Sequence, residues 1–311
     1  MIQVLISIVV LSLLVRGGGY LLRKFKARHL HGTNFHRAVE AGRVSEEVYS
    51  LTSAAWHEAE QKLSTRRKPR LSNEQLVAVM RAEYEMREDY LDHKMKLKFY
   101  QGTIIFVIGS VGGLVMETVW MYVTVGLLQS RVGTVWGPFS PLYGFGAVFF
   151  TIICWNFRRK HVPWWVVPLA SVGIGGILEQ FTGWVMESLF DAQSWTYLGL
   201  PDAITQWVSW RSLAAWGAIG MAWRYVIMPE VLYRIGVPTT RRQIIVVAVL
   251  AAWLTCDLLM TMAVFSRKTY RDMNVPPQTP LQVWIDQHYT DDWIEGRFQN
   301  LVVGKQLGPN L

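Results

Sequence analysis

The chain has 311 residues, of which 51% are hydrophobic, and its formal net charge is +8 at pH 7. The basic residues flank long apolar runs, which is typical of membrane proteins, so we expect the lipid bilayer and not nucleic acid as the partner. The two cysteines, Cys154 and Cys256, both lie in apolar runs, which argues against a disulfide framework.

Residues 1–22 begin with an apolar run to Val15, and four basic residues follow within 23–28. No positive charge precedes the run, and no small-residue cleavage site follows it. We therefore expect an uncleaved N-terminal membrane anchor with its N-terminus outside.

Residues 23–100 are polar and rich in charge. Two stretches with apolar residues at helical spacing are separated by Arg66-Arg67-Lys68-Pro69-Arg70, which predicts a cytoplasmic helical hairpin. The hairpin either braces the membrane bundle or docks a cytoplasmic partner, and both interpretations stay open. Three nearby histidines have no cysteine or acidic residue beside them, so we predict no metal site.

Residues 101–266 contain five further apolar runs, at about 102–128, 142–157, 163–190, 211–235 and 243–265. With the anchor they predict an all-α, polytopic membrane helix bundle of about six spans. Basic residues at 158–161 and 238–242 place these two turns on the inner side. Residues 267–311 are expected to form a short polar C-terminal tail.

The run 163–190 contains a regular stripe, in which Gly175, Glu179, Gly183 and Glu187 recur every four residues. Residues at this spacing share one helix face. An ionised carboxylate at the centre of a membrane helix costs about 2.5–3.5 kcal/mol on insertion scales. The stripe should therefore face protein or a water-filled cavity, and its small residues should let a neighbouring helix approach closely.

The run 102–128 has a weak sequence similarity to this run, because Ser110-Val111-Gly112-Gly113 precedes Glu117 there. Its counterpart is Ser171-Val172-Gly173, followed by Gly175 and Glu179. Either the chain contains a tandem two-helix repeat, as many transporters do, or the similarity arises by chance in glycine-rich helices.

Ionisable side chains inside membrane helices are costly, so each of them is a candidate functional residue. They line a substrate path or form a charge relay, or else they are ion pairs that hold helices together. The candidates are Glu117, Glu179, Glu187, Asp257, Arg211 and Arg224. Turn-forming and interfacial aromatic residues are candidates for shaping the loops. They are Gly137, Pro138, Pro141, Tyr143, Gly144, Trp195 and Tyr197.

No G-x-x-x-x-G-K-[ST] phosphate loop, H-E-x-x-H or G-x-S-x-G motif occurs, so no ATPase activity is expected of this chain and we predict no cofactor. We do not expect this chain to be an enzyme of another kind. Paired carboxylates can nevertheless do acid–base work, and an intramembrane enzyme remains an alternative.

Four motifs occur in order, and they resemble one known family. They are Gly137-Pro138-Phe139-Ser140-Pro141-Leu142-Tyr143-Gly144, the helix from Glu179 through Thr182 and Glu187 to Phe190, Trp195-Thr196-Tyr197, and Arg211-Ser212-Leu213 before Trp216-Gly217. Over about 102–300 the chain is similar to the CmpB-like ABC-transporter permeases, also called ABC-transporter type IV.

The resemblance implies a multi-pass permease subunit in the plasma membrane. Transport would be powered by a separate ATP-binding cassette subunit, which would then be a partner of this chain, or by an ion gradient. Two alternatives from other classes stay open. One is the intramembrane enzyme, and the other is a membrane scaffold or assembly factor that uses the 23–100 hairpin as its contact surface.

Overall fold

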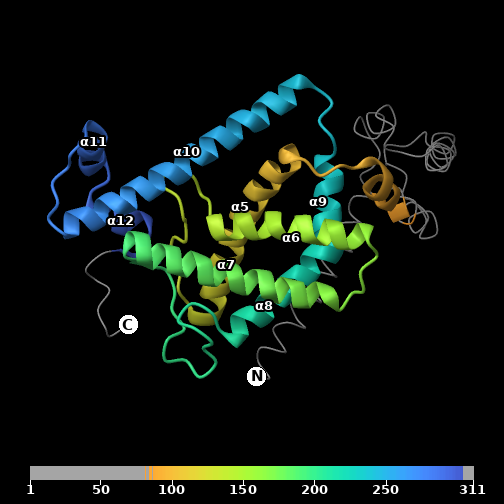
Figure 1. Cartoon of the computed structure of the whole chain (residues 1–311), viewed down its shortest axis with the longest axis horizontal. Helices are drawn as coiled ribbons and strands as arrows, with labels where there is room; N and C mark the ends of the chain where they lie inside the picture. The colour runs from red at the N-terminus through yellow and green to blue at the C-terminus, as the bar shows by residue number, and fades with distance from the viewer. Residues whose placement is uncertain (1–80, 82–83, 86, 304–311) are drawn as a thin grey trace, which may run out of the picture. The chain divides into compact units, whose positions relative to one another are not determined.

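The computed structural model describes residues 81, 84–85 and 87–303 (Figure 1). The predicted anchor at 1–22 and most of the predicted hairpin at 23–100 lie outside the described residues. The described chain forms two compact units, one made of 81–96 with Tyr225–Gly236 and the other of 97–224 with 237–303.

The described residues are mostly helical, as an all-α fold requires. The helices are η1 (Tyr90–Lys94), α5 (Phe99–Val125), α6 (Pro141–Arg159), α7 (Val166–Phe190), α8 (Trp210–Ala222), η2 (Trp223–Ile227), α9 (Met228–Ile235), α10 (Arg241–Asp272), α11 (Pro280–His288) and α12 (Asp291–Arg297). Two short strands, β1 (Ala192–Gln193) and β2 (Val302–Val303), complete the described elements.

The larger unit is built around two close helix pairs, α5 with α6 and α7 with α8. Helices α6 and α7 join the pairs and lie side by side and antiparallel (Figure 1). Within each pair, a glycine allows the two helices to approach closely. A Cβ at Gly113 of α5 would overlap the Tyr143 ring of α6, and a Cβ at Gly175 of α7 would overlap the Trp216 ring of α8. The α7 stripe therefore faces protein, with Gly175 against α8 and Gly183 against Trp207 of the loop before α8.

Three described helices, α5, α7 and α10, are long and apolar enough to cross a membrane. They carry large apolar side chains on their outer surfaces, such as Val123, Ile177 and Val249, which are 74%, 71% and 63% exposed. Apolar surface of this extent requires a lipid environment or a partner. The predicted count of six spans is not confirmed by the described residues.

The predicted single helix 211–235 is interrupted. Its first part is α8, a π-helical turn follows as η2, and α9 begins at Met228. Pro229 has no backbone N–H to donate, so the regular ladder cannot continue through it, and a π-turn is a common local adjustment.

The predicted polar tail contains a folded cap over the far end of α10. That helix continues beyond the expected end to Asp272. We call 273–303, which contains α11, α12 and β2, the C-terminal cap. Strand β2 pairs antiparallel with β1 just after α7, and Val264, Ile285 and Phe298 are buried in a shared core.

Salt bridges join α10 to this cap. Arg267 Nε and Arg271 Nη1 donate to Asp286 Oδ1 at 2.8 and 2.7 Å, and Arg271 Nη2 donates to Asp291 Oδ1 at 2.7 Å. Burial opposes ionisation of Asp286, but the two arginines outweigh it and hold the pKa of this carboxyl below its ordinary value. The basic residues at the end of α10 therefore anchor the acidic cap.

In the smaller unit, η1 packs on α9. Tyr90 and Tyr233 meet edge to face at 5.6 Å between ring centroids, and Arg87 Nη1 lies 3.6 Å from Glu230 Oε2. Leu91 and Leu232 are fully buried there.

Candidate functional site

Glu179 lies near the middle of α7 and is only 7% exposed. Polar groups of Ser212 and Trp216 on α8 face its carboxyl. Its Oε2 atom is buried and has no hydrogen-bond partner. A buried polar atom without a partner is costly, so this oxygen is a candidate contact for a ligand or a proton.

Tyr143, at the start of α6, connects Glu179 with a second acid. Its hydroxyl interacts with Glu117 of α5 and with Glu179 of α7. Glu117 itself forms a salt bridge, in which Arg131 Nη1 donates to its Oε1 at 2.6 Å. The structure therefore brings two of the predicted acids to one phenol, and it gives the first of them a basic partner from the loop after α5.

Tyr197 approaches Glu179 from the loop after α7. Its side chain contacts Ser209 and Ser212 and interacts electrostatically with Glu179 and Arg211. Burial raises the pKa of the Tyr197 hydroxyl, so it keeps its proton near neutral pH. We call Glu117, Tyr143, Glu179 and Tyr197 the Glu179 cluster.

Glu187 lies two turns after Glu179 and faces the loop. Its Oε2 accepts a hydrogen bond from Gln206 Nε2 at 2.8 Å. The glycine between the two acids has a packing role, since a Cβ at Gly183 would overlap the Trp207 ring. Glu187 thus secures the loop against the end of α7.

Asp257 is fully buried in α10 and binds the Gly-Pro loop. Its Oδ1 accepts from the Trp136 backbone N–H at 2.8 Å, and its Oδ2 accepts from the Gly137 N–H at 3.0 Å. Arg297 Nη2, from α12, also holds this loop by donating to the Gly137 carbonyl at 2.7 Å. The acid predicted for a path or relay is therefore placed where it fixes a loop.

The two predicted arginines lie apart from Glu179. Arg211 binds Asp202 through both carboxylate oxygens, at 2.6 and 2.7 Å, and this hydrogen-bonded guanidinium lowers the pKa of Asp202. Arg224, in η2, lies near Cys154 of α6. Neither arginine is a direct partner of Glu117, whose cation is Arg131.

The remaining loop candidates have structural contacts. Pro141 begins α6, and a Cβ at Gly144 would overlap Ser110 Oγ and the Phe106 ring. Trp195 Nε1 donates to the Trp207 carbonyl at 3.0 Å. Pro138 lies exposed beside Gly137. Apart from Pro138, these residues therefore have packing or hydrogen-bonding roles at the start of α6 and in the loop after α7.

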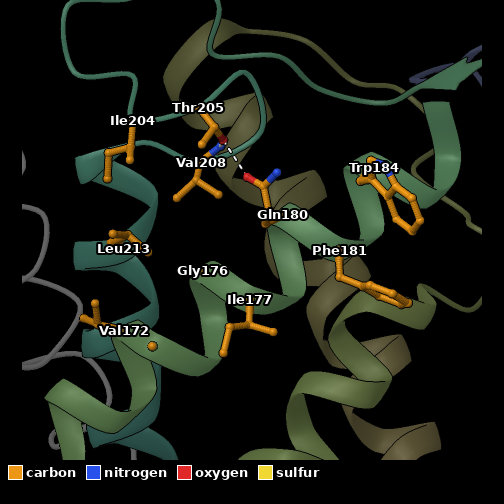
Figure 2. Close-up of a pocket in the computed structure, with 11 residues that line it drawn as sticks. Val172, Gly176, Ile177, Gln180, Phe181, Trp184, Ile204, Thr205, Val208 and Leu213 are labelled. Carbon is orange, nitrogen blue, oxygen red and sulfur yellow. Dashed lines mark hydrogen bonds between the residues drawn. The ribbon is translucent and has the colours of Figure 1, made fainter. Parts of the chain in front are cut away.

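An apolar groove of about 670 Å³ lies between α7 and the segment 204–213 (Figure 2). Ile177 and Phe181 line one side, and Val208 and Leu213 line the other. Gln180 Oε1 accepts a hydrogen bond from Thr205 Oγ1 at 2.8 Å across it. No acid lines the groove, so it is separate from the Glu179 cluster.

Arg131 and Arg297 are the residues that sequence reasoning missed. Both lie outside the apolar helices, where a basic residue has no special significance. For Arg131 a signal existed, because it follows the helix of Glu117 after a short loop. No pattern linked Arg297 to the Gly-Pro loop, which lies about 160 residues away.

Among the described residues, no group of three or more His, Cys, Asp or Glu side chains is arranged to hold a metal ion. The site consists instead of carboxyls, phenols and a serine hydroxyl between helices with apolar outer surfaces. These features define the class of the chain as a helical membrane protein with acids buried in its core.

The comparison with family models identifies the family. The model described as "Putative ABC-transporter type IV" matches residues 104–262, half of the chain, and the chain belongs to this family. The match confirms the resemblance found in the sequence motifs. No curated protein and no solved structure matches the chain. Family membership and the apolar helices are compatible with a component of a membrane transporter.

Proposed function

We propose that this chain is the permease subunit of a transporter and that its polar path passes the Glu179 cluster. The observation that carries the proposal is that the Tyr143 hydroxyl hydrogen-bonds to Glu117 and interacts electrostatically with Glu179. The two acids come from two different helix pairs, and charge at this depth is costly. A polar meeting point between two helix pairs is a favourable place for a transport site.

The remaining acids have a supporting role in this proposal. Glu187 and Asp257 hold the loops at 191–209 and 126–140, and these loops shape the entrance to the cluster. Arg131 balances the charge of Glu117. Arg211 acts through its pairing with Asp202 at the loop surface.

The sequence contains no phosphate loop, so energy from ATP would come from a separate ATP-binding cassette subunit. We place the protein in the plasma membrane, with 23–100 on the cytoplasmic side, where that subunit would bind. This assignment depends on the charge pattern, since most of 23–100 lies outside the described residues.

The test uses the tagged full chain, purified in mild detergent and reconstituted with the ATP-binding subunit that copurifies with it. The assay measures ATP hydrolysis by the complex in proteoliposomes. Glu179→Gln removes the ionisable group with little change in volume, and we expect it to change the rate. The matched control is Asp292→Asn at an exposed position, which should leave the rate unchanged.

Two results would count against the proposal. If no ATP-binding subunit copurifies with the chain, an ATP-driven transporter is excluded. If Glu179→Gln left all activity intact while deletion of 23–100 abolished it, a scaffold would be the better explanation.

A further inference from the structure

The Glu179 carboxyl is buried, yet its polar neighbours are neutral. Oε2 has no hydrogen-bond partner, and the groups that face the carboxyl from α8 belong to Ser212 and Trp216. Moving a full charge out of water costs several kcal/mol unless an opposite charge and good hydrogen bonds compensate. The neutral acid avoids most of this cost.

The nearby cations are bound to other acids. Arg131 forms its salt bridge with Glu117, and Arg211 forms its salt bridge with Asp202. A second carboxylate, Glu117, lies on the far side of Tyr143 and adds negative charge. Both observations favour the uncharged form of Glu179 in this conformation.

We propose that Glu179 is a proton-binding carboxyl, neutral in this conformation, which exchanges its proton through Tyr197 towards the 191–209 loop. This inference deepens the proposed function, because it rests on the Glu179 cluster as the transport site and makes the proton one of its ligands. A proton suits this donor set better than a metal ion, since a single carboxyl offers too few ligands for a divalent cation.

The route follows from the groups that surround Glu179 on each packed element. Tyr143 faces it from α6 and is followed by the Glu117–Arg131 salt bridge. Tyr197 faces it from the loop and also interacts with Arg211, which is exposed. The Tyr197 side leads to Arg211, whose side chain is 53% exposed, whereas the side chain of Arg131 on the Tyr143 side is 10% exposed. The polar and titratable groups around Glu179 are Tyr143, Tyr197, Ser212 and Trp216. Glu117 is a partner of Tyr143, and Ser209 is a partner of Tyr197.

Exchange conserves charge and atoms. The proton on the Glu179 carboxyl passes to the Tyr197 oxygen as the phenol releases its own proton towards water at the loop. The products are ionised Glu179, neutral Tyr197 and a hydrated proton. The same steps in reverse return a proton to Glu179.

The test is infrared difference spectroscopy of the full chain in proteoliposomes during a pH change, in H₂O and in D₂O. We expect a carbonyl band of a protonated carboxyl that shifts in D₂O and disappears in Glu179→Gln. The matched control is Glu187→Gln on the same helix, which should retain the band because Gln206 already binds that carboxyl. A band that persists in Glu179→Gln, or disappears in Glu187→Gln, would overturn the proposal.

The route has its own test, which also applies if Glu179→Gln does not fold. Tyr197→Phe should retain the band and slow its exchange with D₂O, whereas Tyr143→Phe should leave the exchange rate unchanged. The opposite pattern would refute the route.

The outcomes separate this inference from the proposed function. If ATP hydrolysis by the complex changes in Glu179→Gln but the wild type has no protonated carboxyl, the proton site is wrong and the transport site stands. If the band is present and hydrolysis is unaffected, the proton site stands and the transport site is wrong.

Discussion

Asp257→Asn tests how the Gly-Pro loop is held. The side chain is fully buried, and each carboxylate oxygen accepts one backbone N–H, from Trp136 and Gly137. Asparagine keeps the shape but can accept with only one atom, and its NH₂ group faces the other N–H. A hydrogen bond to a charged group contributes about 1.5–3 kcal/mol, and leaving a buried donor unpaired costs about 1–3 kcal/mol. These effects overlap, so we expect a loss of about 3 kcal/mol in the free energy of unfolding.

The assay is unfolding of the purified protein in mixed micelles, followed by tryptophan fluorescence, with amide hydrogen exchange measured at 134–137. Asp292→Asn, at an exposed position of α12, is the matched control and should change stability by less than about 0.5 kcal/mol. Exchange at Gly137 should accelerate only in the Asp257 variant. A loss below about 1 kcal/mol, or unchanged exchange at 136 and 137, would show that the loop is held by other contacts.

Three further predictions follow from single contacts. Gly113→Ala should destabilise the protein by about 1–3 kcal/mol in the same unfolding assay, since its Cβ would overlap an aromatic ring of α6, while Gly112→Ala, which meets nothing, should not. A double-mutant cycle with Arg131→Met and Glu117→Gln should give a coupling energy of about 0.5–3 kcal/mol, and additive effects would contradict the salt bridge. The lowered pKa of Asp286 contributes stability that is fully present above its unfolded value of about 3.9 and is lost as the pH falls through the folded pKa. Amide protection factors in the C-terminal cap, which are exchange rates corrected for the intrinsic pH dependence, should therefore fall at acidic pH. Asp286→Asn should remove this dependence.

The positions of the long helices and the packing face of α7 could be predicted from the sequence. Apolar runs and a four-residue spacing are local signals, and they indicated α5, α7 and α10 and a glycine stripe on α7 that packs closely against protein. The buried position of Glu179 follows from the same spacing. Membrane helices carry this information because lipid forces polar groups onto the protein-facing side.

The partners of the acids could not be predicted in the same way. Asp257 looked like a further intramembrane acid, but its ligands are two backbone N–H groups of a loop about 120 residues earlier. Arg211 looked like a counter-ion for the core, but a closer acid, Asp202, binds it at the surface. Such choices depend on where loops cross the helices, and helix periodicity carries no signal for that.

The C-terminal cap shows the same limit. Its sequence is polar, so it resembled a tail, although capping threonines precede both of its helices. Thr279 and Thr290 accept from the backbone N–H groups of Gln282 and Trp293. The apolar residues that bury this segment are few, and they need the ends of α7 and α10 to complete their core.

Each of the two helix pairs packs a glycine against an aromatic ring, which gives the internal sequence similarity a physical meaning. In the first pair a Cβ at Gly113 would overlap a ring of α6, and in the second a Cβ at Gly175 would overlap a ring of α8. One helical turn after each glycine comes an acid, Glu117 or Glu179. Close packing at the glycine therefore fixes the depth of the acid. Tyr143, whose ring covers the first glycine, also hydrogen-bonds to Glu117 and interacts electrostatically with Glu179. Enlarging either glycine should thus disturb the Glu179 cluster as well as the packing.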